Sequence, residues 1–80
     1  MKERVEMIWE FRGPQAVPTA EHHTIHLEEF IKSEKLESSF CRLNRYSDQL
    51  AAVSLITPMA YMEDLRQRLK PHKGRRYQER

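Results

Sequence analysis

Three histidines lie close together in the segment His22-His23-Thr24-Ile25-His26. Imidazole nitrogens bind transition metals, and imidazole also exchanges protons near neutral pH. Side chains four residues apart on a helix point the same way, so His22 and His26 have the spacing to hold one divalent transition-metal ion. The segment lacks the Glu of the His-Glu-x-x-His motif, because His23 stands at that position. A metal site here therefore needs a third ligand from elsewhere in the chain.

The same histidines are candidates for a small-ligand site or for an acid–base step. The loop 13–18, which contains Gly13, Pro14 and Pro18, precedes them and is expected to form the rim of a pocket. An aromatic residue and an arginine just before this loop are expected to complete it. The expected ligand-binding residues are His22, His23, His26, Trp9 and Arg12.

The first elements follow from hydrophobic periodicity. Apolar residues alternate with polar ones over 4–12, which predicts a strand with one buried face. A helix is predicted over 19–35, with Thr19 as its cap. On a helical wheel His23 lies within the apolar face, whereas His22 and His26 lie on its flank. We therefore expect His23 to be a packing residue and the other two to be the paired donors.

The second half of the chain predicts a hairpin and another helix. Strands are expected over 39–46 and 50–57, the second apolar on both faces as a central strand would be. Thr57-Pro58 begins a helix predicted over 58–70, and Pro71 ends it. Residues 75–79 are either a short edge strand or part of a solvated tail.

The element order predicts an α+β fold, a β-α-β-β-α two-layer sandwich of the ferredoxin-like class whose fourth strand is short or lacking. Residues 1–72 form the single α+β domain in this interpretation, and residues 73–80 form a basic C-terminal tail. A right-handed crossover makes the first two strands parallel and places both helices on one face of the sheet. The opposite face is left uncovered, which favours a homodimer through that face or through an edge strand.

On the first helix, His26-Leu27 followed by Phe30 resembles small dimeric α+β barrel proteins. The resemblance covers the element order and these few residues. In several such families a histidine of the first helix lines a ligand cavity, so the resemblance implies a small enzyme that uses a histidine as acid or base.

The net charge of +2 hides an asymmetry between the two ends of the chain. Residues 1–65 carry 7 basic and 11 acidic residues, whereas residues 66–80 carry 7 basic and 1 acidic. Such a basic end can neutralise phosphates, with Tyr77 available to stack on a base. The candidate nucleic-acid residues are Arg68, Lys73, Arg75 and Arg76. The alternative is a solvated tail, and the absence of aromatics from 50–57 disfavours base-specific recognition by the sheet.

One cysteine, Cys41, is expected to be a small buried residue, because a single cysteine forms no internal disulfide. No apolar leader or long apolar run is present, so the chain is expected in the cytoplasm and away from membranes. The leading hypothesis is a homo-oligomeric ligand-binding or interaction domain with its site near the histidine helix and the loop 13–18. The alternatives are the histidine enzyme and nucleic-acid binding through the basic end.

Overall fold

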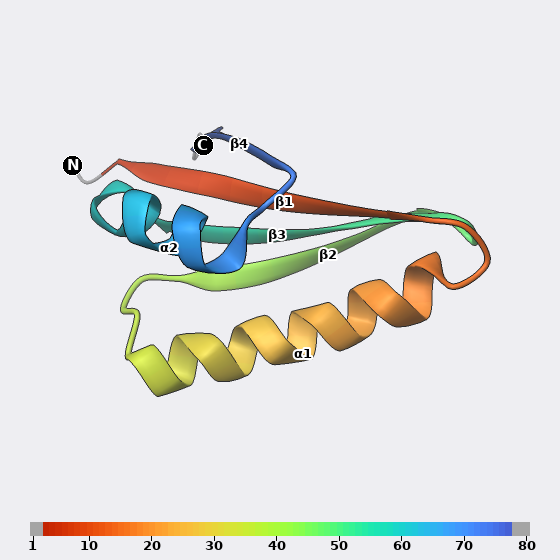
Figure 1. The fold of residues 1–80 in the computed structure, drawn as a ribbon, viewed down its shortest axis with the longest axis horizontal. Helices are drawn as coiled ribbons and strands as arrows, with labels where there is room; N and C mark the ends of the chain where they lie inside the picture. The colour runs from red at the N-terminus through yellow and green to blue at the C-terminus, as the bar shows by residue number, and fades with distance from the viewer. Residues whose placement is uncertain (1–2, 78–80) are drawn as a thin grey trace.

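The computed structural model describes residues 3–77, which form a four-stranded antiparallel sheet and two α-helices (Figure 1). In chain order the elements are β1 (Arg4–Arg12), α1 (Ala16–Glu34), β2 (Phe40–Ser47), β3 (Leu50–Pro58), a 3-10 turn (Met59–Tyr61), α2 (Met62–Leu69) and β4 (Lys73–Tyr77). The α+β fold expected from the sequence is confirmed, and the arrangement is compatible with a two-layer sandwich. No helix in the described part of the chain is long and apolar enough to cross a membrane.

The strands lie in the order β2-β3-β1-β4, and every neighbouring pair is antiparallel. Both β1 and β2 are antiparallel to β3, which lies between them. They therefore run in the same direction without being neighbours, as the crossover through α1 predicts. The centre of the sheet is β3, where all seven residues from Ala51 to Thr57 are buried. Its lack of polar–apolar alternation reflects cover on both faces.

The hydrophobic core lies between the sheet and the helices. Val5, Met7 and Trp9 point from one face of β1 toward Leu27 of α1 and Leu65 of α2, and each of these side chains is at most 5% exposed. Both helices therefore cover the same face of the sheet. The indole Nε1 of Trp9 also donates to the carbonyl of Leu69 at 3.3 Å, which ties the end of α2 to β1.

The first helix begins at Ala16, three residues before the predicted start at Thr19. Pro18 was expected to keep residues 13–18 in a loop, but it occupies the first turn of α1. The first four N–H groups of a helix have no intrahelical acceptor, so proline loses no hydrogen bond there. The connection shrinks to residues 13–15, where Gly13 adopts a positive φ of 100° and donates to the carbonyl of Gln49 at 2.9 Å.

The second helix is shorter than the predicted range 58–70. Pro58 ends β3, and the 3-10 turn precedes the two regular turns of α2. Lys70 adopts the left-handed conformation with φ 48°, and Pro71 follows it, as is typical of a helix end.

The C-terminal segment contributes an edge strand. Lys73–Tyr77 pair with β1, so the strand expected over 75–79 begins two residues earlier. Residues 78 and 79 lie outside the described residues, as does residue 80. The basic segment from 73 onwards is thus part of the sheet as far as Tyr77.

Candidate functional site

The paired histidines lie together on the exposed side of α1. The ring centroids of His22 and His26 are 4.4 Å apart, so the predicted four-residue spacing does bring them side by side. Within residues 3–77, however, no group of three His, Cys, Asp or Glu side chains converges in a way that could hold a metal ion. The pair therefore lacks a third ligand from the described part of its own chain, and metal binding stays a prediction.

His23 points toward the sheet, unlike its two neighbours. Its ring lies 4.8 Å from that of Trp9 and 5.6 Å from that of Phe11, measured between centroids. Its Nε2 atom is buried and has no hydrogen-bond partner among the residues that the structure describes. Burial lowers the pKa of His23, and electrostatic repulsion from the nearby His26 imidazole, when that ring is protonated, lowers it further. His23 is thus a packing ring whose Nε2 is shielded from solvent.

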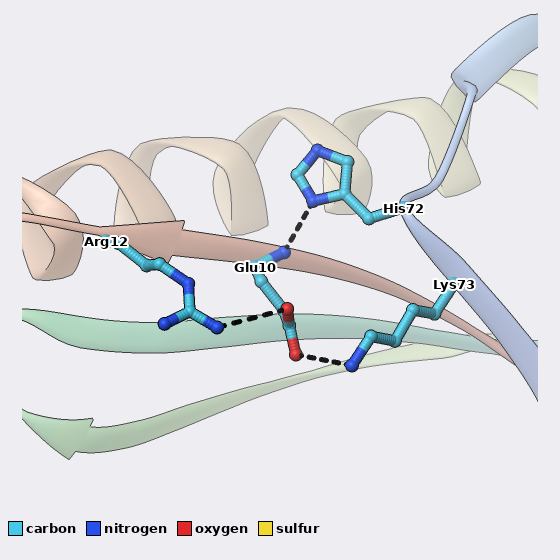
Figure 2. A network of polar contacts seen from close by, with 4 residues as sticks. All are labelled: Glu10, Arg12, His72 and Lys73. Carbon is cyan, nitrogen blue, oxygen red and sulfur yellow. Dashed lines mark hydrogen bonds and ion pairs between the residues drawn. The ribbon is translucent and has the colours of Figure 1, made fainter.

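Sequence reasoning did not place His72 beside these residues. Its ring centroid lies 6.4 Å from that of Phe11, and its Nδ1 accepts a hydrogen bond from the backbone N–H of Glu10 at 2.9 Å (Figure 2). An accepting Nδ1 carries no proton, so this bond exists with the Nε2–H tautomer. The segment after α2 is fixed again where the His72 N–H donates to the carbonyl of Ile8 at 2.9 Å. No local signal predicts these contacts, because the partners are about sixty residues apart.

Arg12 does not join the histidines. Trp9 and Arg12 point to opposite faces of β1, so the predicted ligand-binding set divides between the two sides of the sheet. Arg12 lies within 3.9 Å of the Glu10 carboxylate, which also accepts a 3.0 Å hydrogen bond from Lys73 (Figure 2). Lys73 and the positive charge of Arg12 lower the pKa of Glu10.

The helix-free face of the sheet, called the open face from here on, gathers most of the exposed cationic side chains of the strands. Register places on it alternate residues of each strand, with a shift in β2 between Arg45 and Ser47. Within residues 3–77 the charged strand residues on this face are five cations and two carboxylates, which give a net charge of +3: Arg4, Arg12, Arg42, Lys73, Arg75, Glu6 and Glu10. In β3 the same face carries the small or apolar residues Ala52, Ser54 and Ile56, all buried.

Two aromatic rings lie across the open face. Phe40 comes from the edge strand β2 and Tyr77 from the edge strand β4, yet their ring centroids are 6.1 Å apart in an edge-to-face arrangement. Arg4 lies 5.8 Å above the ring of Phe40, and Arg42 lies 5.6 Å above that of Tyr77. The guanidinium of Arg42 also donates to the Tyr77 hydroxyl at 3.0 Å. The two edges of the sheet are thus bridged by side chains that cover β3.

Glu6 is a buried carboxylate at the centre of the open face, where it is 5% exposed. Arg75 Nε donates to its Oε1 at 2.8 Å. Burial by itself raises the pKa of Glu6, but hydrogen bonds from Ser54 and Arg75 and the charges of Arg75 and Arg42 outweigh burial and lower it. The carboxylate therefore stays ionised and holds β4 onto the sheet.

The predicted nucleic-acid residues are divided between the two sides of the sheet. Lys73 and Arg75 lie on the open face. Arg68 lies in the helix layer, where it pairs with Glu34 at 3.1 Å and stacks on Phe30, and Arg76 pairs with Glu3 at 3.2 Å. The cationic residues of the open face therefore come from strands that are far apart in sequence, not from one linear tail.

Comparisons with protein-family models, with curated proteins and with solved structures found no match to this chain.

Proposed function

We propose that the protein is a small binding domain that holds an extended anion, single-stranded nucleic acid, across the open face. One observation carries the proposal: this face presents five cationic side chains and two aromatic rings, while each of its two carboxylates is already paired with a cation of the same face. Cationic side chains neutralise phosphates, and aromatic or guanidinium planes stack on bases without regard to sequence.

The fold supports this use of the sheet. The strand order β2-β3-β1-β4 with both helices on one side is that of a ferredoxin-like domain, and we propose that class for this chain. RNA-recognition domains also bind single strands on a four-stranded sheet, through aromatics at defined positions. Here the rings lie on the edge strands, and Ala52 and Ser54 occupy the centre. Contacts to the phosphate backbone rather than base-specific recognition are therefore proposed.

A homodimer through the open face has less support. Ile56, Ser54 and Ala52 are at most 3% exposed in the single chain, so this face leaves little apolar surface that needs a partner. A two-fold axis would also bring two faces of net charge +3 together, which repel each other. A homodimer through the unpaired edge of β2, and a cytoplasmic location, stay predictions. The histidine enzyme loses His23 as a donor at its shielded Nε2, while the exposed His22 and His26 keep it a prediction.

The test is the binding of a fluorescently labelled 20-nucleotide oligo-dT, followed by fluorescence anisotropy between 50 and 200 mM salt. Three net positive charges predict a slope of about −2 for log K against log salt, since single strands give about −0.7 per neutralised phosphate. Arg12→Gln and Arg42→Gln are each expected to weaken binding and to reduce the steepness of the slope by about 0.7.

The matched control is Lys32→Gln, which removes one positive charge from the exposed side of α1. It is expected to leave both the affinity and the slope nearly unchanged, because Lys32 lies in the helix layer. Equal losses for Lys32→Gln and Arg12→Gln would show that overall charge rather than the open face governs binding. Absence of binding at 50 mM salt would reject the proposed function.

A further inference from the structure

A crevice of about 410 Å³ lies between α2 and β4, on the helix side of the sheet. Figure 1 shows the chain leaving α2 and crossing over to β4 at the edge of the sheet. The floor of the crevice is formed by Val5 and Met7 of β1, and Met59 and Met62 line it from the other side. Glu6, Lys73 and Arg75 also line the crevice, but their side chains pair with one another or with Glu10 on the open face, whereas Met7 points into the core.

Gly74 keeps this crevice open. It lies opposite Met7 in the β1–β4 pair, and residues directly opposite each other point to the same face, so a side chain at position 74 would extend into the crevice. A Cβ built at Gly74 meets nothing closer than the Glu6 carbonyl oxygen at 4.0 Å. The backbone there is ordinary strand, so the position tolerates larger residues. Glycine weakens a strand, and its presence here leaves room beside the sheet.

Two arginines provide the polar rim. Arg66 of α2 and Arg76 of β4 both line the crevice, and their side chains are 62% and 64% exposed. Each is held by one carboxylate in an exposed ion pair, Arg66 by Glu63 at 2.7 Å and Arg76 by Glu3 at 3.2 Å. Exposed pairs of this kind contribute little free energy. An incoming carboxylate can therefore replace either partner, and the planar guanidinium suits its geometry.

We propose that the crevice binds a small amphipathic monocarboxylate, with its hydrocarbon chain on Val5, Met7 and the two methionines and its carboxylate at Arg66 and Arg76. The volume lies within the range of small-molecule pockets, roughly 300 to 1,000 Å³. Methionine side chains are flexible and polarisable, so they adapt to an alkyl chain. The apolar floor requires a hydrocarbon part, and the cationic rim selects an anionic head.

The experiment is a titration of the ¹⁵N-labelled protein with sodium octanoate, followed by ¹H–¹⁵N NMR, with 1-octanol as the neutral probe of the same length. Octanoate is expected to shift amide signals of α2 and β4 in a saturable way and to bind at least fivefold more tightly than octanol. Gly74→Leu fills the crevice and is expected to weaken octanoate binding at least tenfold. Gly74→Ala, which makes the strand less flexible but fills little space, is the matched control and should bind nearly as the parent does.

The double variant Arg66→Gln/Arg76→Gln separates the two parts of the site. Octanoate binding should fall at least fivefold, while octanol binding should stay within twofold of the parent. Three outcomes would overturn the proposal: shifts that do not saturate, unchanged binding by a folded Gly74→Leu variant, or equal loss of octanoate and octanol in the double variant. Oligo-dT binding by the same variants is a separate measurement, so this site and the open face can fail independently.

Discussion

The ion pair between Glu6 and Arg75 is expected to be the most stabilising polar contact of the sheet. The Glu6 side chain is 6% exposed, whereas that of Arg75 is 68% exposed, so the two partners lose different amounts of hydration when they pair. Replacing Arg75 by Gln leaves a buried carboxylate without its cation. Hydrogen bonds to charged groups contribute about 1.5–3 kcal/mol, and the exposure of Arg75 places this one in the lower half, so Arg75→Gln should cost about 2 kcal/mol.

The thermodynamic cycle tests whether this cost belongs to the pair. Glu6→Gln removes the charge but keeps the shape and an accepting oxygen, so it should cost about 1 kcal/mol. Without the Glu6 carboxylate, Arg75 no longer neutralises a buried charge. The double variant should therefore lower the free energy of unfolding by about 1.5 kcal/mol, less than the sum of the two single losses. The expected coupling free energy is therefore about 1.5 kcal/mol.

Urea unfolding followed by fluorescence measures these values, because the chain has a single tryptophan, Trp9, which is 4% exposed. Arg66→Gln is the matched control. Its pair with Glu63 is as short, 2.7 Å, but both side chains are more than 60% exposed, so the loss should stay below about 0.5 kcal/mol. Additivity of the Glu6 and Arg75 variants within about 0.3 kcal/mol would refute the reasoning. A loss in Arg75→Gln no greater than in Arg66→Gln would refute it as well.

Two further predictions follow from burial. The pKa of His23 is lowered from 6.5, so the unfolded chain binds more protons below that pH, and the free energy of unfolding should fall as the pH drops from 7 toward 5. His23→Phe should remove most of this fall and His22→Gln should retain it, as measured by urea unfolding; equal slopes in the two variants would contradict the assignment. Burial raises the pKa of Cys41 to about 12, with a further contribution from Glu28. Because the thiolate is the reactive form, a thiol reagent at pH 8 should react with the native protein roughly a thousandfold more slowly than with the urea-unfolded chain. Similar rates, read from absorbance after addition of a disulfide reagent, would contradict the burial argument.

The strands were predictable because local patterns determine them. Alternation identifies β1, and the unbroken apolar run identifies β3 as a central strand. The start of α1 was wrong because proline is unfavourable in a helix interior but tolerated in its first turn, and sequence alone does not show in which turn Pro18 lies. The predicted start of β4 was two residues too late, because the pairing of this strand with β1, and not its own residue pattern, determines where it begins.

The candidate site was harder to predict than the fold. The spacing of His22 and His26 correctly predicted that their rings lie side by side, because residues four apart on a helix point in nearly the same direction. The open face has no such local signature. Phe40 and Tyr77 meet although they belong to opposite edges of the sheet, and only the strand order and register bring them together. A surface that consists of alternate residues from several strands leaves no pattern in a run of consecutive residues, so local sequence analysis does not predict it.

The alternation of β4 explains how two adjacent surfaces with different chemistry can share one short strand. All four residues from Lys73 to Arg76 line the crevice. The side chains of Lys73 and Arg75 nevertheless pair with Glu10 and Glu6 on the open face, while Gly74 and Arg76 face the helix side. A charge removed at an odd position of this strand therefore acts on the open face, and a side chain added at position 74 acts on the crevice. Because successive side chains of a strand point to opposite faces, neighbouring substitutions give separate readouts. Residues 73–77 therefore contribute to two surfaces, one on each side of the sheet, rather than forming one cationic tail.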